Sequence, residues 1–183
     1  MIYDLSLKTA GLLSGAILLV LGVIGFLKAE AVSRFLQDFP RSRVAGAVLL
    51  TIDLAWTVWL LFTMEMGEFT GFRKPLLIIL PIAFLLVLRF VDEFLAVRAL
   101  GILLLLAAEP LLEAAFFRYE SSRLLVTVLA YIIIVLGLLW VMMPYMLRDQ
   151  IKWLTSSTAR WKALNGIALV YGGAILGLAV VGY

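Results

Sequence analysis

Long uncharged apolar segments alternate with short charged segments along this chain. Runs of about twenty apolar residues are long enough to cross the hydrocarbon core of a bilayer as α-helices. Six membrane spans are predicted, at residues 9–27, 44–63, 75–91, 96–117, 124–147 and 163–183. The pattern therefore predicts an all-α integral membrane protein: a six-span helical bundle that forms a single membrane domain over residues 1–183.

The third and fourth spans have the weakest signal of the six. Lys74 and Arg89 bound a short apolar core in the third span, and the fourth carries Glu109 and Glu113. Charged side chains at span ends must extend toward the membrane surface for so short a helix to cross. A re-entrant hairpin over these two segments, with four full spans elsewhere, is the alternative.

Two connections have the pattern of amphipathic helices lying in the plane of the membrane surface. The helix of the first connection is expected to end at Pro40. Its apolar side is formed by Ala31, Val32, Phe35, Leu36 and Phe39. The fifth connection has apolar Leu147, Ile151 and Leu154 opposite polar Arg148, Asp149 and Lys152. Both are predicted to be short interfacial connectors, serving either as topology anchors or as a docking surface for a partner.

An internal repeat is also indicated. Residues 34–46 align without gaps to residues 89–101, with matching Arg, Phe, Phe, Arg and Gly positions, and a third copy leads from Lys152 to Gly166. Three similar helical hairpins are therefore predicted, with repeat units 9–63, 75–117 and 124–183. The competing interpretation is that helix boundaries at a membrane surface need the same residue types, so that the similarity is one of composition alone.

Composition narrows the functional classes. Hydrophobic residues make up 64% of the chain and charged residues 15%, with a mean hydropathy of +1.12. Soluble domains average roughly 45–50% hydrophobic residues and roughly 25% charged residues. A soluble enzyme, a nucleic-acid-binding protein and a disordered adaptor are therefore excluded. The chain has no Cys and no His, which removes disulfides and thiolate or imidazole metal ligation. We expect no metal site and no cofactor.

The distribution of Lys and Arg predicts the orientation. The first, third and fifth connections carry ten: Lys28, Arg34, Arg41, Arg43, Arg89, Arg98, Arg148, Lys152, Arg160 and Lys162. The opposite side carries five: Lys8, Arg73, Lys74, Arg118 and Arg123. The positive-inside rule then places both termini on the non-cytoplasmic side of a multi-pass protein in the cell membrane, which is the inner membrane if the source is bacterial. The net charge of +3 is interpreted as contact with membrane lipids rather than with nucleic acid.

Acidic residues inside the predicted spans are the candidate functional site. Asp53 lies near the middle of the second span, with Thr57 one helical turn further on. Glu109 and Glu113 share a face of the fourth span, and Arg98 is a candidate countercharge for them. Acids at this depth are costly and often functional. They predict either an ion- or proton-handling site or hydrogen bonding that holds helices together.

Small residues predict close helix packing in the first and last spans. Gly11 and Gly15 form one small-xxx-small motif, and Gly173 and Gly177 form another. Such motifs allow helix backbones to approach closely. The two spans are expected to pack on each other, or on other subunits.

The sequence contains no catalytic, metal-binding or nucleotide-binding motif. We therefore expect a non-catalytic polytopic membrane subunit, acting as a scaffold or assembly partner in a larger membrane complex or a homo-oligomer. The alternative is a small ion- or proton-coupled transporter or channel subunit that uses the intramembrane carboxylates.

Overall fold

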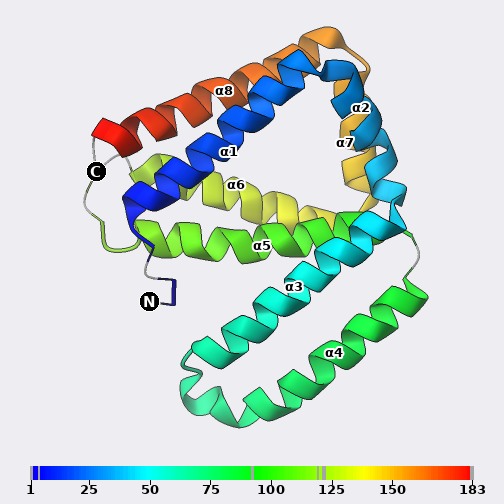
Figure 1. The fold of residues 1–183 in the computed structure, drawn as a ribbon, viewed down its shortest axis with the longest axis vertical. Coiled ribbons are helices and arrows are strands. Elements are labelled where there is room, and N and C mark those ends of the chain that lie inside the picture. Colours follow the sequence, from blue (N-terminus) through cyan, green and yellow to red (C-terminus); the bar gives the residue numbers. More distant parts are fainter. Residues whose placement is uncertain (1, 4, 92, 119, 121–122, 182–183) are drawn as a thin grey trace.

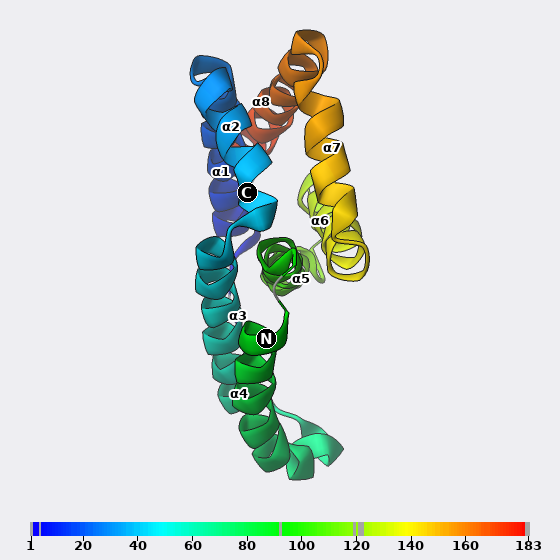
Figure 2. The same ribbon diagram turned by 90° about the vertical axis from the view of Figure 1, so that its right-hand side faces the viewer.

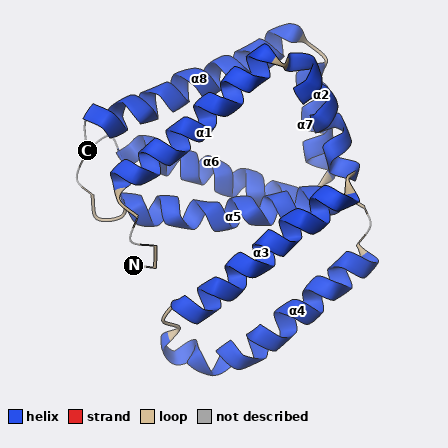
Figure 3. Ribbon diagram, viewed as in Figure 1, coloured by secondary structure: helices blue, strands red, loops and turns tan. Residues whose placement is uncertain are grey.

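The structure, a computed structural model, describes the whole chain except residues 1, 4, 92, 119, 121, 122, 182 and 183. Every element of the described part is helical (Figure 3). The helices are α1 (Leu7–Leu27), α2 (Ala29–Asp38), α3 (Arg43–Thr63), α4 (Arg73–Phe90), α5 (Leu95–Ala115), α6 (Arg123–Met142), α7 (Tyr145–Thr155) and α8 (Thr158–Val181). Two short 3-10 helices, Phe39–Arg41 and Gly67–Phe72, precede α3 and α4.

Six of these helices are long and apolar enough to cross a membrane, which agrees with the predicted number of spans. Four of them begin and end within about two residues of the predicted limits, the usual uncertainty of a helix end. The fifth predicted span was too long, because α6 stops at Met142 and a separate helix, α7, begins at Tyr145, directly after Pro144. The residue before a proline disfavours helical geometry, which accounts for the break. The last span begins earlier than predicted, at Thr158.

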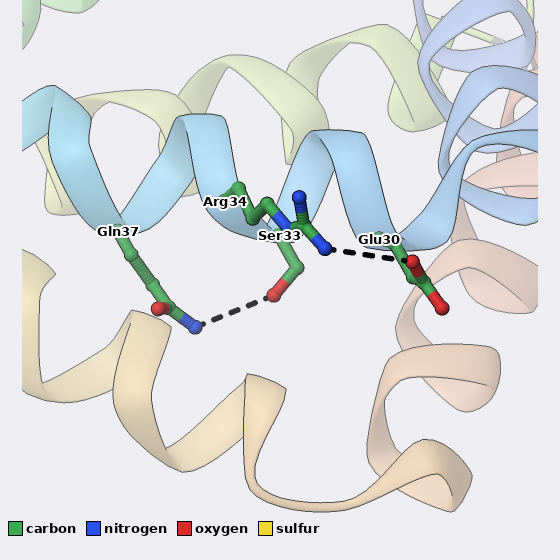
Figure 4. A network of polar contacts seen from close by, with 4 residues as sticks. All are labelled: Glu30, Ser33, Arg34 and Gln37. Atoms are coloured by element: carbon green, nitrogen blue, oxygen red, sulfur yellow. Dashed lines mark hydrogen bonds and ion pairs between the residues drawn. The ribbon is translucent and has the colours of Figure 1, made fainter.

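The two predicted amphipathic connectors are helices α2 and α7. Both lie across one end of the bundle, whereas the start of α1 and the end of α8 lie at the other end (Figure 1). Gln37 of α2 donates from Nε2 to the Oγ1 of Thr155 in α7 over 3.3 Å, so the connectors contact each other directly. Figure 4 shows the polar side of α2, where Arg34 and Glu30 form an ion pair at 3.8 Å.

Three helix pairs dominate the packing: α1 with α8, α5 with α6, and α3 with α5. Helices α1 and α8 are antiparallel, since Gly15 lies against Gly172 and Gly25 against Asn165. Helices α5 and α6 are antiparallel as well, since Gly101 lies against Val141 and Gly137 against Leu105. Gly46 lies against Ala96, so α3 and α5 begin together and run in the same direction. These pairs are not the consecutive hairpins expected from the repeat units, since each pair joins helices from different units.

Helix α5 lies at the centre of the packed region, and α4 lies at its edge (Figures 1 and 2). One core cluster joins α1, α5, α6 and α8 through Leu7, Ala115, Val126, Leu129 and Ile175. A second joins α5 to the connector α7 and contains Val97, Leu147 and Ile151. Helix α4 contacts α3 and has no buried residue.

Candidate functional site

Asp53 is buried inside the bundle. It is 3% exposed and lies two helical turns from Gly46, on the face of α3 that packs against α5. Neither carboxyl oxygen has a hydrogen-bond partner among the described residues. A buried polar group without a partner is costly. Among the described residues, the carboxyl group is therefore an unsatisfied polar group inside the bundle.

Thr57 does not provide that partner. Its Oγ1 donates to the backbone carbonyl of Asp53 over 2.8 Å, the common bond between a helical threonine and the residue one turn earlier. The hydroxyl proton is thus used within α3. A polar site formed by Asp53 and Thr57 remains a prediction.

Glu109 and Glu113 lie near the C-terminal end of α5, beside the N-terminal segment of the chain. The backbone N–H of Tyr3 donates to Oε2 of Glu113 over 3.2 Å. The Tyr3 hydroxyl accepts a 2.8 Å hydrogen bond from the indole Nε1 of Trp56 in α3, and its ring lies 5.5 Å from that of Trp59. Tyr3 thereby joins α3 to the acidic end of α5.

Sequence reasoning missed Tyr3 as a member of the site. An aromatic residue before the first span is a signal for a membrane interface, but it does not indicate which helices the ring contacts. Burial raises the pKa of the Tyr3 phenol above its ordinary value. The hydrogen bond from Trp56 opposes this shift, and the nearby Glu109 and Glu113 add to it. The phenol therefore stays protonated at neutral pH.

The two glutamates line an open hollow of about 560 Å³ between α5 and α6. Its other lining residues are apolar: Ile2, Leu105, Ala108, Leu112, Phe116 and Ile134. A second hollow of about 540 Å³ shares Leu112 and Phe116 with it and is lined by Arg118 and Arg123. The hollow that contains the two glutamates therefore lies next to a hollow that contains two arginines. No group of three acidic side chains in the described chain is placed to hold a metal ion.

The predicted site residues do not form one cluster. Asp53 does not line the hollow of the glutamates, and no hydrogen bond or ion pair among the described residues joins it to Glu109. Arg98 is exposed in the first turn of α5. Eleven residues separate it from Glu109, about 16 Å along a helix. A relay between Asp53 and Glu109, with Arg98 as countercharge, remains a prediction without a direct contact.

The glycine motif of α1 lies at a helix contact. A Cβ added at Gly15 would lie 2.9 Å from the carbonyl oxygen of Gly172, and Gly11 is buried. In α8, however, a Cβ at Gly173 or Gly177 would meet no atom within 4 Å. Packing of α1 on α8 is therefore observed, but it uses Gly172. Contact of Gly173 and Gly177 with another molecule remains a prediction.

Comparison of the chain with protein-family models, curated proteins and solved structures gave no match.

Proposed function

We propose that this protein is a non-catalytic polytopic membrane subunit that acts as a scaffold or assembly partner, in a larger membrane complex or a homo-oligomer. The observation that carries this proposal is the exposure of α4, which contacts α3 but has no buried residue. With its preceding 3-10 turn it forms a 24-residue apolar segment of which 0% is buried within the chain.

Helix association in a bilayer depends on van der Waals packing and interhelical hydrogen bonds, because lipid tails are as apolar as the side chains. Helix α4 uses one side to contact α3 and leaves the other open. Ile78, Ile82 and Leu85 on the open side are exposed and spaced as in a helix–helix seam. This open face fits a helix of a partner subunit or of a second copy.

The shape of the chain supports the same function. The limb formed by α3 and α4 extends away from α1 and α8 (Figure 1), and Gly166, Gly173 and Gly177 leave an outer face of α8 without a neighbour in the described chain. We infer a cell-membrane protein that contacts lipids and other membrane subunits or itself, and not nucleic acid. Both termini are proposed to lie on the non-cytoplasmic side, and the three-hairpin repeat is retained as a hypothesis about sequence origin.

Native mass spectrometry after mild-detergent or nanodisc extraction tests the assembly role. The unmodified chain should co-migrate with specific partners or further copies. The double variant Ile82→Trp/Leu85→Trp should run as a lone chain, because two indoles disturb the open face of α4. The matched control is Val135→Trp/Leu138→Trp on exposed positions of α6, and it should assemble normally. A lone unmodified chain in nanodiscs would contradict the proposal.

A second candidate function rests on the carboxylates. Asp53 is buried without a hydrogen-bond partner among the described residues, and the glutamates line an open hollow. These features fit a small ion- or proton-coupled transporter. In that case Asp53→Asn and Glu109→Gln should each abolish flux in proteoliposomes while the protein remains folded. Full flux in the double variant excludes the carboxylates as coupling groups.

A further inference from the structure

Two hollows meet at the end of the molecule where α2 and α7 lie. One, of about 240 Å³, is lined by Leu36, Gln37, Asp38, Pro40, Arg41, Arg148, Ile151 and Lys152. The other, of about 410 Å³, is lined by Arg41, Glu93, Phe94 and Arg148. Because Arg41 and Arg148 line both, we treat the two as one concave region, the basic hollow.

Three cations line the basic hollow, and two of them have no partner within the part of the chain that the structure describes. The side chains of Arg41 and Lys152 form no hydrogen bond or ion pair with the described residues. Arg148 donates from Nε to Oδ1 of Asp149 over 2.9 Å, and its guanidinium lies 5.9 Å from the centre of the Phe94 ring. Arg148 is thus oriented, while the other two cations are available to a ligand.

The charge balance of the hollow favours an anion of low charge. Asp38 and Glu93 also line it. Among the described lining residues, the three cations therefore exceed the carboxylates by a single charge, and Asp149, which pairs with Arg148, lies outside this lining. A phosphodiester carries one negative charge and matches this excess. The apolar lining of Leu36, Pro40 and Ile151 suits the hydrocarbon beside a lipid headgroup.

The walls of the hollow are held by packing. Phe94 has a left-handed backbone, with φ 58°, which an L-residue adopts only when its surroundings impose it. It packs against the buried cluster of Val97, Leu147 and Ile151. This packing places Phe94 beside Arg148, so this wall of the hollow is in place before a ligand binds.

We propose that the basic hollow binds the phosphodiester group of an anionic phospholipid, in the leaflet where α2 and α7 lie. Basic pockets at the surface end of a helical bundle are suited to such headgroups, and guanidinium groups form strong, charge-assisted hydrogen bonds with phosphate oxygens. This site goes beyond the assembly role and does not depend on it.

The test is native mass spectrometry of the purified full chain with phosphatidylglycerol or phosphatidylcholine added. The unmodified protein should retain one phosphatidylglycerol in preference to phosphatidylcholine. Arg41→Gln/Lys152→Gln should lower phosphatidylglycerol binding about tenfold or more, as expected for loss of a charge-assisted hydrogen bond. Arg41→Lys/Lys152→Arg keeps both charges and should retain binding.

The matched control is Lys28→Gln/Arg89→Gln, which removes one exposed Lys and one exposed Arg at the same end but outside the hollow. It should bind phosphatidylglycerol as the unmodified protein does. An equal loss in this control would reduce the effect to general surface charge and overturn the site. Equal retention of the two lipids would also overturn it. Displacement of the lipid by millimolar inorganic phosphate would show that free phosphate, and not a lipid, is the ligand.

Discussion

At the scale of single residues, Trp161 joins the two terminal spans by a buried hydrogen bond. Its indole Nε1 donates to the backbone carbonyl of Gly25 over 2.8 Å, and the side chain is 8% exposed. Asn165, one turn further along α8, donates to the carbonyl of Trp161 and packs directly on Gly25. Gly25 admits the Asn165 side chain because it has no side chain of its own.

Trp161→Phe should therefore destabilise the protein. The variant keeps an aromatic ring but loses the interhelical hydrogen bond, with an expected cost of about 1–2 kcal/mol. Thermal unfolding in detergent, followed by circular dichroism, measures the change. Trp153→Phe is the matched control, because Trp153 is exposed; its unfolding temperature should be nearly unchanged. Equal effects of the two variants would mean that the indole bond contributes nothing.

Tyr3 gives a prediction about pH. Its pKa is raised above 10.0, first by burial, so the folded chain keeps the phenolic proton at pH values where the unfolded chain has lost it. The contribution of Tyr3 to stability should therefore decrease as the pH rises above about 10. Absorbance near the phenolate band, compared between the unmodified protein and Tyr3→Phe, isolates this titration. A difference spectrum that gives Tyr3 a pKa at or below the ordinary tyrosine value of 10.0 would contradict the inferred rise of its pKa.

At the scale of helices, the pairing of α1 with α8 depends on which glycine faces the partner. Gly172 lies opposite Gly15, and an added Cβ would lie 2.8 Å from the Cβ of Leu18 and 3.0 Å from the carbonyl oxygen of Gly15. The adjacent Gly173 faces open space. One residue along a helix turns a side chain by about 100°, which separates a contact position from an outer one.

Substitution of these adjacent glycines should give opposite results. Gly172→Ala should destabilise the chain by about 1–3 kcal/mol, because the methyl group forces α1 and α8 apart. Gly173→Ala should be neutral or stabilising by up to about 1 kcal/mol, because alanine favours the helix. Thermal unfolding of both variants in the same detergent makes the comparison. Similar destabilisation by both would show that the register of α1 on α8 differs from the one described.

At the scale of the whole molecule, the directions of the packed helices agree with six successive membrane crossings. The pairs α1/α8 and α5/α6 are antiparallel and α3/α5 is parallel, as expected when odd and even spans run in opposite directions. The amphipathic α2 and α7 then lie together at one surface (Figures 1 and 2). The loop between α3 and α4 lies at the opposite surface (Figure 1).

The absence of cysteine from the sequence makes this topology directly testable. Ser156→Cys, between α7 and α8, and Glu68→Cys, between α3 and α4, introduce single thiols at exposed positions. In intact cells a membrane-impermeant maleimide should label the thiol at position 68, whereas labelling at position 156 should require permeabilised cells. Labelling of both thiols in intact cells would contradict the crossing pattern, and the reverse result would invert the proposed orientation.

The six apolar helices and the two amphipathic connectors are predictable from the sequence, because span length and helical periodicity are local properties. The sequence also identified Asp53 as an unusual buried acid and Gly15 as a contact residue. The packing of the helices was needed to see that Gly172 rather than Gly173 meets α1, and that Tyr3 reaches Trp56. It likewise separated Asp53 from the hollow of the glutamates. Apolar helices resemble one another on every face, so their pairing and rotation follow from backbone approach and side-chain shape across the whole bundle.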